Sequence, residues 1–460
     1  MVQSGFPVRV PLVTEPMGVL KSLQTARRNV LEILPEIATR QPMVSGRTGK
    51  RWHMVMDPDA LGQILRDKLP DYPKSDVTKD LLRPAIGESL FIAEGQEWHW
   101  QRRTAAPSFS HRHVMALAPV MSAAAERAVQ RLEAAAGKRA INMFDEMVQT
   151  TFEVISDVTF SGDEGFDRDG VHHAIEAYIQ STAKISLGDM LGLPSWVPRL
   201  SRIRSGGALT DMQRVADEAI QRRRASGQPN AAPDLLDLLL AGADPESGRQ
   251  MSTEELRDNL LTFIVAGHET TALSLSWALY LVAGDPRVQD LARAEAQSVL
   301  GDRVAGAEDV PNLPYIRQIV DEALRMYPPA ALVSRTARKA DRLCGREVWP
   351  GDTVMIPIYA LHRNNLLWDD PDAFRPERFA DRKAIRRYAY LPFGDGPRIC
   401  IGASFALTEA VIILATLLAR YRFDLVPGRP PKPVMILTLR PDGGVWLMLE
   451  PRPANQLKRV

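Results

Sequence analysis

The sequence predicts a mainly α-helical protein with a minor β portion. Most segments from about Trp98 to Leu240 carry apolar residues at helical spacing, and a long apolar helix follows from Ser252. Strand-like segments are short and are found early in the chain and in its last third. The 460 residues contain no internal repeat, low-complexity tract or clear linker, so we expect a single domain spanning residues 1–460.

The first half of the chain starts with mixed signals and then becomes helical. A turn signal from Gly46 to Gly49 lies between short apolar segments and predicts a β-hairpin. A short helix is expected directly after Asp57 and Pro58, in "DALGQILRD". Residues 116–137 and 209–227 predict two longer helices, each of which ends near a glycine.

The second half is built around one long helix. Ser252 and Glu255 form a capping-box signal, and helical spacing then continues to Ala283, a length of roughly 45 Å. This helix is apolar nearly all round, so it should run through the core. A further helix is predicted for residues 313–328, strands within 346–361 and a last helix from about residue 400. Residues 435–452 alternate and turn like a hairpin.

Composition and charge exclude several classes of protein. The net charge of +1 gives no bulk attraction to nucleic acid or to a membrane, so neither is expected as a partner. Two cysteines cannot build a disulfide framework, which favours a reducing, cytoplasmic setting. The N-terminus lacks an apolar segment typical of a signal peptide. The most apolar stretch carries His268 and Glu269 near its middle, so we expect a buried helix of a soluble protein and no transmembrane segment.

A glycine-rich loop, "LPFGDGPRICIG", leads into the last helix. Gly394 and Gly396 allow positive φ angles and a close approach of the backbone to another group. The helix start behind Cys400 and the charge of Arg398 should lower the pKa of the thiol, as suits a soft anionic metal ligand. A small buried hydrophobe and a nucleophile are the alternatives for Cys400. Cys344 lacks such surroundings and is expected to be a buried hydrophobe.

The loop resembles the haem-binding signature of the cytochrome P450 family, F-G-x-G-x-R-x-C-x-G. The resemblance implies a soluble, bacterial-type member with the cytochrome P450 fold, in which haem b lies between the long central helix and the helix of the cysteine loop. Cys400 would be the axial ligand of the haem iron. The fixed positions of the signature are Phe393, Gly394, Gly396, Arg398, Cys400 and Gly402.

The long helix contains the unusual stretch "AGHETTA". Thr270 can bond back to the carbonyl of Ala266 and bend the helix, which alone would be an ordinary kink. The stretch resembles the family's oxygen-binding motif, A/G-G-x-D/E-T-T/S, in which His268 fills a variable position. The resemblance implies that the helix opens at Ala266 and Gly267 to admit dioxygen. Thr270 would hydrogen-bond the dioxygen, and Glu269 would help deliver protons.

A second set of charged residues resembles the family's structural motifs. Glu322 and Arg325 share a helix face, which alone indicates no more than a surface ion pair. They match the family's E-x-x-R motif, and Arg378 matches the arginine of the following P-E-R-F segment. The resemblance makes these three a structural triad that supports the cysteine loop.

Other residues are predicted to bind the haem propionates, because arginines hold carboxylates well. Each arginine alone would be a solvated side chain by default. The cofactor-binding set implied by the resemblance is Trp98, Arg102, Arg335 and Arg398, together with Phe393, Gly402, Ala266 and Gly267.

The resemblance implies a monooxygenase, an oxidoreductase that inserts one oxygen atom of dioxygen into a C–H bond. Its electrons would come ultimately from NAD(P)H through a ferredoxin or flavodoxin with its reductase, docked near the basic run at residues 382–388. A peroxygenase or isomerase, or a haem sensor without turnover, is the alternative, and the acid–alcohol pair of Glu269 and Thr270 argues against both. Apolar pocket residues, typical of a lipophilic substrate, are expected at Phe91, Ile92, Phe263, Ala330, Leu332, Val333 and Leu437.

Overall fold

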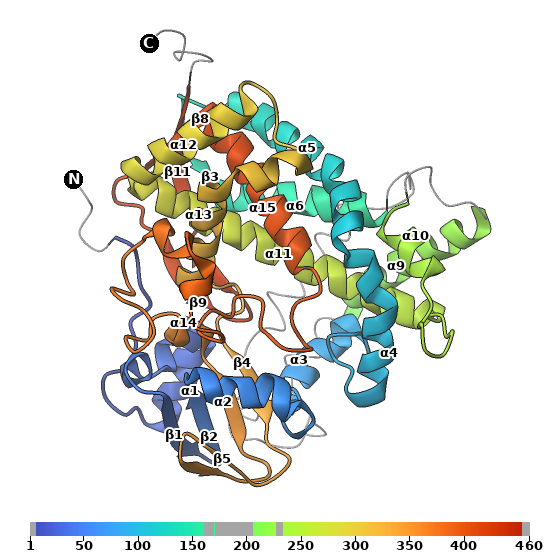
Figure 1. Cartoon of the computed structure of the whole chain (residues 1–460), viewed down its shortest axis with the longest axis vertical. Coiled ribbons are helices and arrows are strands. Elements are labelled where there is room, and N and C mark those ends of the chain that lie inside the picture. The colour runs from blue at the N-terminus through green and yellow to red at the C-terminus, as the bar shows by residue number, and fades with distance from the viewer. Residues whose placement is uncertain (1–5, 161–169, 171–205, 227–232, 453–460) are drawn as a thin grey trace.

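The computed structural model describes residues 6–160, 170, 206–226 and 233–452. A large helical part contains α5, α6, α11, α12, α13 and α15, and a smaller part with the main sheet lies at the opposite end (Figure 1). The α-helices are α1 (Val19–Arg28), α2 (Pro58–Gly62), α3 (Asp76–Ile86), α4 (Gly95–Ala105), α5 (His111–Glu133), α6 (Met143–Thr159), α9 (Gly206–Ser226), α10 (Leu235–Ala241), α11 (Thr253–Gly284), α12 (Pro286–Leu300), α13 (Pro314–Met326), α14 (Ile358–Leu361) and α15 (Ala403–Arg420).

The strands form four small sheets with the orders β1-β2-β7-β4, β3-β11-β8, β9-β10 and β5-β6. β1 and β2 are the hairpin predicted from the Gly46–Gly49 turn, with Met43 paired to Val55. The strands are β1 (Met43–Thr48), β2 (Lys50–Val55), β3 (Ile141–Asn142), β4 (Val333–Thr336), β5 (Asp341–Leu343), β6 (Arg346–Val348), β7 (Thr353–Ile356), β8 (Tyr421–Leu425), β9 (Lys432–Met435), β10 (Leu439–Asp442) and β11 (Trp446–Pro451).

The hairpin predicted for residues 435–452 is wrong in its pairing. The chain does turn at Gly443 and Gly444, both with positive φ. The strands on either side nevertheless belong to different sheets, because β10 pairs with β9 and β11 pairs with β8 and β3. Alternation of apolar and polar residues predicts a strand, but it does not predict the strand with which it pairs. The last hairpin is therefore β9–β10, with Leu437 in the turn at its tip.

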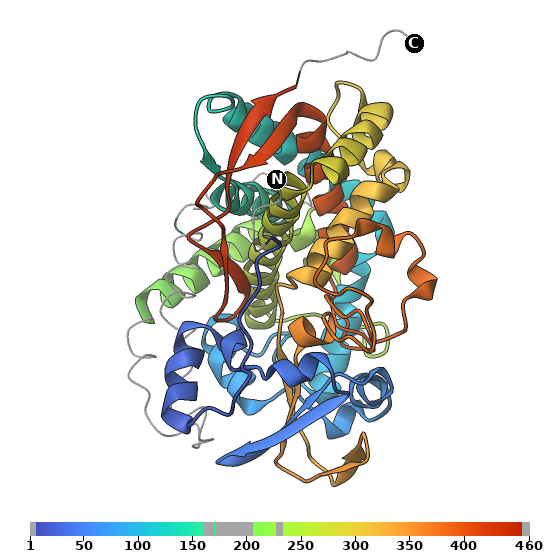
Figure 2. The same cartoon turned by 90° about the vertical axis from the view of Figure 1, so that its left-hand side faces the viewer.

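α11 is the central helix, as its all-round apolar sequence predicts. Ser252 and Glu255 form the predicted capping box at its N-terminus. Trp277 is fully buried and stacks on Tyr327 of the segment after α13, with ring centroids 4.1 Å apart. α6, α13 and α15 pack along α11 (Figure 2). Burial of a large apolar side chain contributes about 1.5–3 kcal/mol, so this helix anchors the core.

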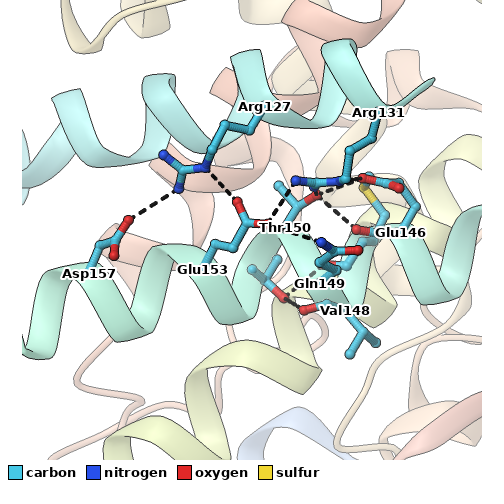
Figure 3. Close-up of polar contacts among 10 residues, drawn as sticks. Arg127, Arg131, Glu146, Val148, Gln149, Thr150, Glu153 and Asp157 are labelled. Carbon is cyan, nitrogen blue, oxygen red and sulfur yellow. Dashed lines mark hydrogen bonds and ion pairs between the residues drawn. The ribbon is translucent and has the colours of Figure 1, made fainter. Parts of the chain in front are cut away.

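An ion-pair network fixes α6 against α5 on the side away from α11 (Figure 3). Arg131 of α5 binds Glu153 and Glu146 of α6 at 2.7 and 2.7 Å. Arg127 binds Glu153 at 2.7 Å, and burial raises the pKa of Glu146 despite its arginine partner. The opposite face of α6 holds α11, where Thr151 donates a hydrogen bond of 2.8 Å to the carbonyl of His268.

α15 is long and apolar enough to cross a membrane, with a mean hydropathy of 1.7. However, 72% of the helix is buried inside the protein, as in the core helix of a soluble protein. It is the one such helix in the described ranges. The predicted helices at 116–137, 209–227 and 313–328 correspond to α5, α9 and α13. Part of the predicted helical region from Trp98 to Leu240, at 161–169 and 171–205, lies outside the described residues.

Candidate active site

The cysteine loop is closed by its own backbone and held close to another segment. The N–H of Cys400 donates to the carbonyl of Phe393 at 2.9 Å. Gly394 and Gly396 have φ angles of 70° and 73°. A Cβ at Gly396 would lie 2.3 Å from the carbonyl oxygen of Leu65, whereas one at Gly394 or Gly402 would have nothing within 4 Å. Gly396 therefore permits a close approach within the chain, and Gly394 leaves free space beside the cysteine.

The pKa of the Cys400 thiol is raised in the structure, whereas the sequence predicts that it is lowered. Cys400 is exposed, yet desolvation by the surrounding protein raises the pKa of the thiol above its ordinary value. A hydrogen bond from the Gly402 backbone and the charge of Arg102 lower the pKa, but they are outweighed. Desolvation therefore exceeds the helix-start effect that the sequence suggested, and a bound cation would be needed to hold a thiolate here.

The expectation that Cys344 is a buried hydrophobe is wrong, because the residue is exposed. It lies in the turn between β5 and β6, with a positive φ of 48°. Burial raises the pKa of its thiol to about 11. No loop or positively charged cluster surrounds it in the described part of the chain, so it has no feature of a ligand.

Glu322, Arg325 and Arg378 come together behind the cysteine loop. Glu322 and Arg325 on α13 are both fully buried, and the guanidinium contacts the carboxylate at 2.6 and 2.8 Å. Arg325 also donates to the carbonyls of His362 and Pro371 at 2.8 and 2.7 Å. Arg378 Nε lies 3.3 Å from Glu322 Oε1, an ion-pair distance without hydrogen-bond geometry. The arrangement ties α13 to the chain that leads into the loop.

His362 joins this cluster to the loop and was not singled out by the sequence. Its Nδ1 lies 3.1 Å from the carbonyl of Arg325, and its Nε2 accepts a hydrogen bond of 2.8 Å from the N–H of Leu391. The ring is fully buried, and burial lowers its pKa to about 3. A neutral imidazole thus bridges α13 and the first residue of "LPFGDGPRICIG". A histidine in "ALHRNN" carries no sequence signal for this role.

Arg398 and Trp98 meet at the carboxylate of Glu94. The guanidinium of Arg398 stacks over the Trp98 ring at 4.3 Å and donates to the carbonyl of Ala93 at 2.8 Å. It also forms an ion pair with Glu94, and Lys79 lies 3.7 Å from the same carboxylate. Burial lowers the pKa of Arg398 to about 10.

More cations surround Glu94 than one carboxylate can neutralise. Arg335 on β4 is 8% exposed and Arg102 on α4 is half-buried, and burial lowers the pKa of both. Within the described ranges neither has a carboxylate at ion-pair distance. Lys74 was missed by the sequence reasoning. Burial, followed by repulsion from Arg335 and Arg398, lowers its pKa well below the ordinary value. This buried positive excess fits an anionic ligand with more than one carboxylate.

α11 presents its "AGHETTA" stretch without a break. The helix is continuous, so the predicted opening at Ala266 and Gly267 is not present in this structure. Thr270 Oγ1 donates to the carbonyl of Ala266 at 2.7 Å, and Thr271 does the same to Gly267 at 3.0 Å. Ala266 is exposed and Thr270 half-buried, whereas the residues from Thr271 to Ala283 are buried. The back-bonding threonines weaken the helix where the opening was predicted.

The two carboxylates near this stretch have different surroundings. Glu269 is 4% exposed and accepts from Arg440 Nε and Thr438 Oγ1 at 2.5 and 2.7 Å. Glu409 on α15 is 2% exposed and contacts Thr271, and its Oε1 has no hydrogen-bond partner in the described part of the molecule. Burial raises the pKa of Glu409 well above its usual range. Glu269 is thus paired with a cation, whereas no cation lies at ion-pair distance from Glu409 in the described ranges.

The predicted pocket residues fall into two groups. Ile92 and Phe263 are buried in the core, at 2% and 7% exposed, and Phe263 meets Phe109 edge-on at 5.0 Å. The others retain accessible surface and come from three separate segments: Phe91, Ala330 with Leu332 and Val333, and Leu437.

The comparisons with known proteins agree with this geometry. The family model for Cytochrome P450 matches residues 11–448. The chain belongs to the cytochrome P450 family. It is 32% identical to cyclooctatin synthase of Streptomyces melanosporofaciens, over 92% of each chain. It is also 32% identical to cyclooctat-9-en-7-ol 5-monooxygenase of the same organism (92% of this chain, 90% of the relative) and to cytokinin hydroxylase of Arabidopsis thaliana (91% and 84%).

Family membership confirms the predicted recognition and fold class, a mainly helical cytochrome P450 fold with a minor β portion. It also confirms the enzyme class: this cytochrome P450 is an oxidoreductase of the monooxygenase type. The family implies haem and dioxygen. The residues fit haem, because Cys400 is exposed in a loop where Gly394 and Gly402 leave open space, and Arg102, which has no carboxylate at ion-pair distance in the described ranges, acts electrostatically on the thiol.

Proposed function

We propose that this cytochrome P450 hydroxylates or epoxidises a lipophilic small molecule, using haem b bound through the Cys400 thiolate. The observation that carries the proposal is the Cys400 thiol, which is exposed at the end of the glycine loop and lies near enough to Arg102 for the two charges to interact. Bound haem with a thiolate ligand supplies the activation of dioxygen for insertion into a C–H bond. The single-domain organisation over residues 1–460 remains part of this proposal.

The residues of the chain would bind and orient this group. Arg102, Arg335 and Arg398 would hold the propionates, and Lys74 would add charge. Trp98 would keep Arg398 in place by stacking. The triad of Glu322, Arg325 and Arg378 would fix the loop that carries Cys400. Phe393, Gly394 and Gly402 would line the space at the cysteine, and Ala266 and Gly267 would line it from α11.

Thr270 and Glu269 would handle protons on the α11 side. The Thr270 hydroxyl now donates to the Ala266 carbonyl, and release of that bond would free it to donate to bound dioxygen. The Glu269 carboxyl group would return a proton to the Thr270 hydroxyl. A peroxygenase or an isomerase, which needs no external electrons, would often lack such an acid–alcohol pair, and a sensor without turnover would have no need for it.

A lipophilic substrate is supported by the accessible pocket residues, which are all apolar: Phe91, Ala330, Leu332, Val333 and Leu437. The relative named cyclooctat-9-en-7-ol 5-monooxygenase supports a terpene-like alcohol or hydrocarbon as the first class to test. We further propose a cytoplasmic, soluble protein that receives electrons, ultimately from NAD(P)H, through a ferredoxin or flavodoxin and its reductase.

The electron-donor surface is proposed near residues 382–388, beside Ile399, which is 40% exposed. The net positive charge of this surface is smaller than the basic run in the sequence suggests, because its arginines are paired with aspartates. Arg382 pairs with Asp321 at 2.9 Å, Arg386 with Asp59 at 2.9 Å and Arg387 with Asp395 at 3.4 Å. Steering of an acidic partner would therefore be moderate and dependent on salt.

Turnover with a terpene panel tests the proposal. The protein is supplied with NADPH, a ferredoxin and its reductase, and products and peroxide are measured against NADPH consumed. We expect a hydroxylated or epoxidised product, and Thr270→Ala should keep NADPH use while shifting its yield to peroxide. Product formed equally well from peroxide without reductant would instead support the peroxygenase alternative, and unchanged yield in Thr270→Ala would remove that residue from the relay.

A further inference from the structure

Residues 87–90 connect α3 to α4 and lead directly into Phe91, one of the proposed pocket residues. The segment is built from turns, and Gly87 at its start has a positive φ of 52°. Ser89 and Leu90 are nevertheless buried. A buried turn segment needs partners for its backbone polar groups, so the side chains that supply these partners determine where the segment lies.

Three polar side chains of α4 and α11 hold this segment, and we call them the clasp: Gln101, Asp258 and Asn259. Asn259 Oδ1 accepts from the N–H of Leu90 at 2.9 Å, and Asp258 Oδ2 accepts from the N–H of Glu88 at 3.2 Å. Gln101 Nε2 donates to the carbonyl of Glu88 at 3.0 Å. All three side chains are buried, so little water competes for these bonds.

The members of the clasp also hold one another in place. Asn259 Nδ2 donates to Gln101 Oε1 at 3.1 Å and to the carbonyl of Glu255 at 2.8 Å. Because both its amide nitrogen and its oxygen are bonded, the Asn259 side chain has one orientation. A Cβ at Gly87 would lie 1.8 Å from Asp258 Oδ2, so glycine lets the backbone approach this carboxylate directly.

Asn259 lies at the head of the α11 face that carries the proposed site. Phe263 and Thr270 follow it by four and eleven residues, which are about one and three helical turns, so the three side chains share this face. The bond from the Leu90 N–H to Asn259 therefore fixes the backbone next to Phe91 relative to Phe263.

We propose that the clasp, with Asn259 at its centre, positions the substrate pocket: it holds the wall that carries Phe91 against α11 and so sets the affinity for molecules that reach this wall. The clasp residues act through the backbone of residues 87–90 and are positioning residues. This inference rests on the apolar pocket of the proposed function.

Phe91 has a second anchor, so loss of the clasp should loosen the wall without removing it. Lys74 Nζ donates to the carbonyl of Phe91 at 2.5 Å and lies 3.5 Å from the centroid of its ring. Lys74 belongs to the cation cluster proposed for the haem propionates. Asp258 also pairs with Arg257, which binds Asp217 of α9 at 3.3 Å. Asn259 and Gln101 are therefore the clasp residues whose replacement disturbs these other contacts least.

The test uses the haem-loaded protein as wild type, Asn259→Leu, Gln101→Met and Gln289→Leu. Gln289 on α12 is the matched control, a buried amide that bonds the N–H and the carbonyl of Phe423 on β8. Two probes that bind haem iron through nitrogen are titrated by absorption: imidazole, which carries no group that extends to a pocket wall, and 4-phenylimidazole, which does. Hydrogen–deuterium exchange of residues 87–93 is the second readout, and it requires no turnover.

We expect the wild type to bind 4-phenylimidazole more tightly than imidazole. This preference should fall about tenfold in Asn259→Leu and by a smaller factor in Gln101→Met, because the hydrogen bonds that hold the wall are lost. Exchange of residues 87–93 should become faster in the same order. Gln289→Leu should match the wild type in both readouts, and all variants should bind imidazole alike. If Asn259→Leu does not take up haem, Gln101→Met decides by the same two readouts.

The outcomes separate the inference from the proposed function. If the wild type binds 4-phenylimidazole no more tightly than imidazole, the apolar pocket of the proposed function is wrong and the inference fails with it. If the wild type has the preference and the clasp variants keep it, only the inference is wrong, whether or not exchange becomes faster. An equal loss of preference in Gln289→Leu would also overturn the inference, because the effect would then follow from general destabilisation.

Discussion

Two glutamate–arginine pairs flank the proposed haem site, and they are built differently. Glu322 and Arg325 lie one turn apart on a single helix and are both fully buried. Glu269 and Arg440 come from a helix and a distant hairpin, and Arg440 is 29% exposed. The same two residue types therefore serve both in a closed core and at a boundary with solvent.

The partners of each pair explain the difference. Arg325 gives its remaining donors to main-chain carbonyls of His362, Pro371 and Ala373, which belong to the segment that leads toward the cysteine loop. Among the described residues, the groups that donate to Glu269 are the side chains of Arg440 and Thr438. A pair bonded to backbone fixes a loop in place, whereas a pair bonded to side chains can open. We expect the first to govern stability and the second to govern proton supply.

The largest expected effect is on the closed pair. Arg325→Gln removes the two guanidinium hydrogen bonds of the buried Glu322 carboxylate and leaves it only the contacts with Arg378 and the N–H of Arg375, which should cost about 3–5 kcal/mol in the free energy of unfolding. Denaturant titration and haem content measure it. Arg317→Gln on the same helix is the control, at about 1 kcal/mol or less, because Asp321 keeps Arg382 and Tyr390. If the two variants lose the same free energy of unfolding, the Glu322–Arg325 pair stabilises the fold no more than the Arg317–Asp321 pair does.

Low pH should weaken the contact that His362 makes between Arg325 on α13 and Leu391 at the start of the cysteine loop. Burial lowers the pKa of His362 to about 3, so the unfolded chain binds a proton near pH 6.5 that the folded protein does not bind. Stability due to this residue is full above pH 6.5 and falls as the pH drops toward 3, by roughly 2–3 kcal/mol at pH 4.5. Denaturation of the wild type and His362→Gln at pH 7 and 4.5 measures the difference. If both lose equal stability, His362 is not the acid-sensitive link.

The open pair should show the smallest effect on stability. Arg440→Gln is expected to cost about 1–2 kcal/mol, because Arg440 is partly solvated and Glu269 keeps the hydrogen bond from Thr438. Denaturant titration beside Arg325→Gln checks this order. A loss in Arg440→Gln as large as that in Arg325→Gln would mean that the two pairs do the same structural work.

The sequence predicted the parts of the molecule that depend on local signals. The capping box at Ser252 and the long apolar helix are local, and the structure contains both. The predicted hairpin is also present, but its turn is at Gly49, because Gly46 lies within β1 opposite Trp52. The cysteine loop and the E-x-x-R spacing also stand in the sequence as short motifs. The partner of β10 is not local, since it depends on how the last strands meet other sheets, and the prediction there was wrong.

The missed site residues depend on contacts between distant segments. His362 gains its role from a backbone carbonyl on α13 and an N–H at Leu391. Glu409 is one glutamate in an apolar helix, and Arg440 is one arginine in a short strand. The thiol pKa at Cys400 was predicted with the wrong sign because the extent of desolvation cannot be read from neighbouring residues.

The most direct test of the account is the spectrum of the reduced, haem-loaded protein under carbon monoxide, in the wild type, Cys400→Ala and Cys344→Ala. The account predicts the red-shifted Soret band of a thiolate ligand in the wild type and in Cys344→Ala, and its loss in Cys400→Ala. The same band retained in Cys400→Ala, or absent from haem-loaded wild-type protein, would contradict the assignment of Cys400 as the ligand.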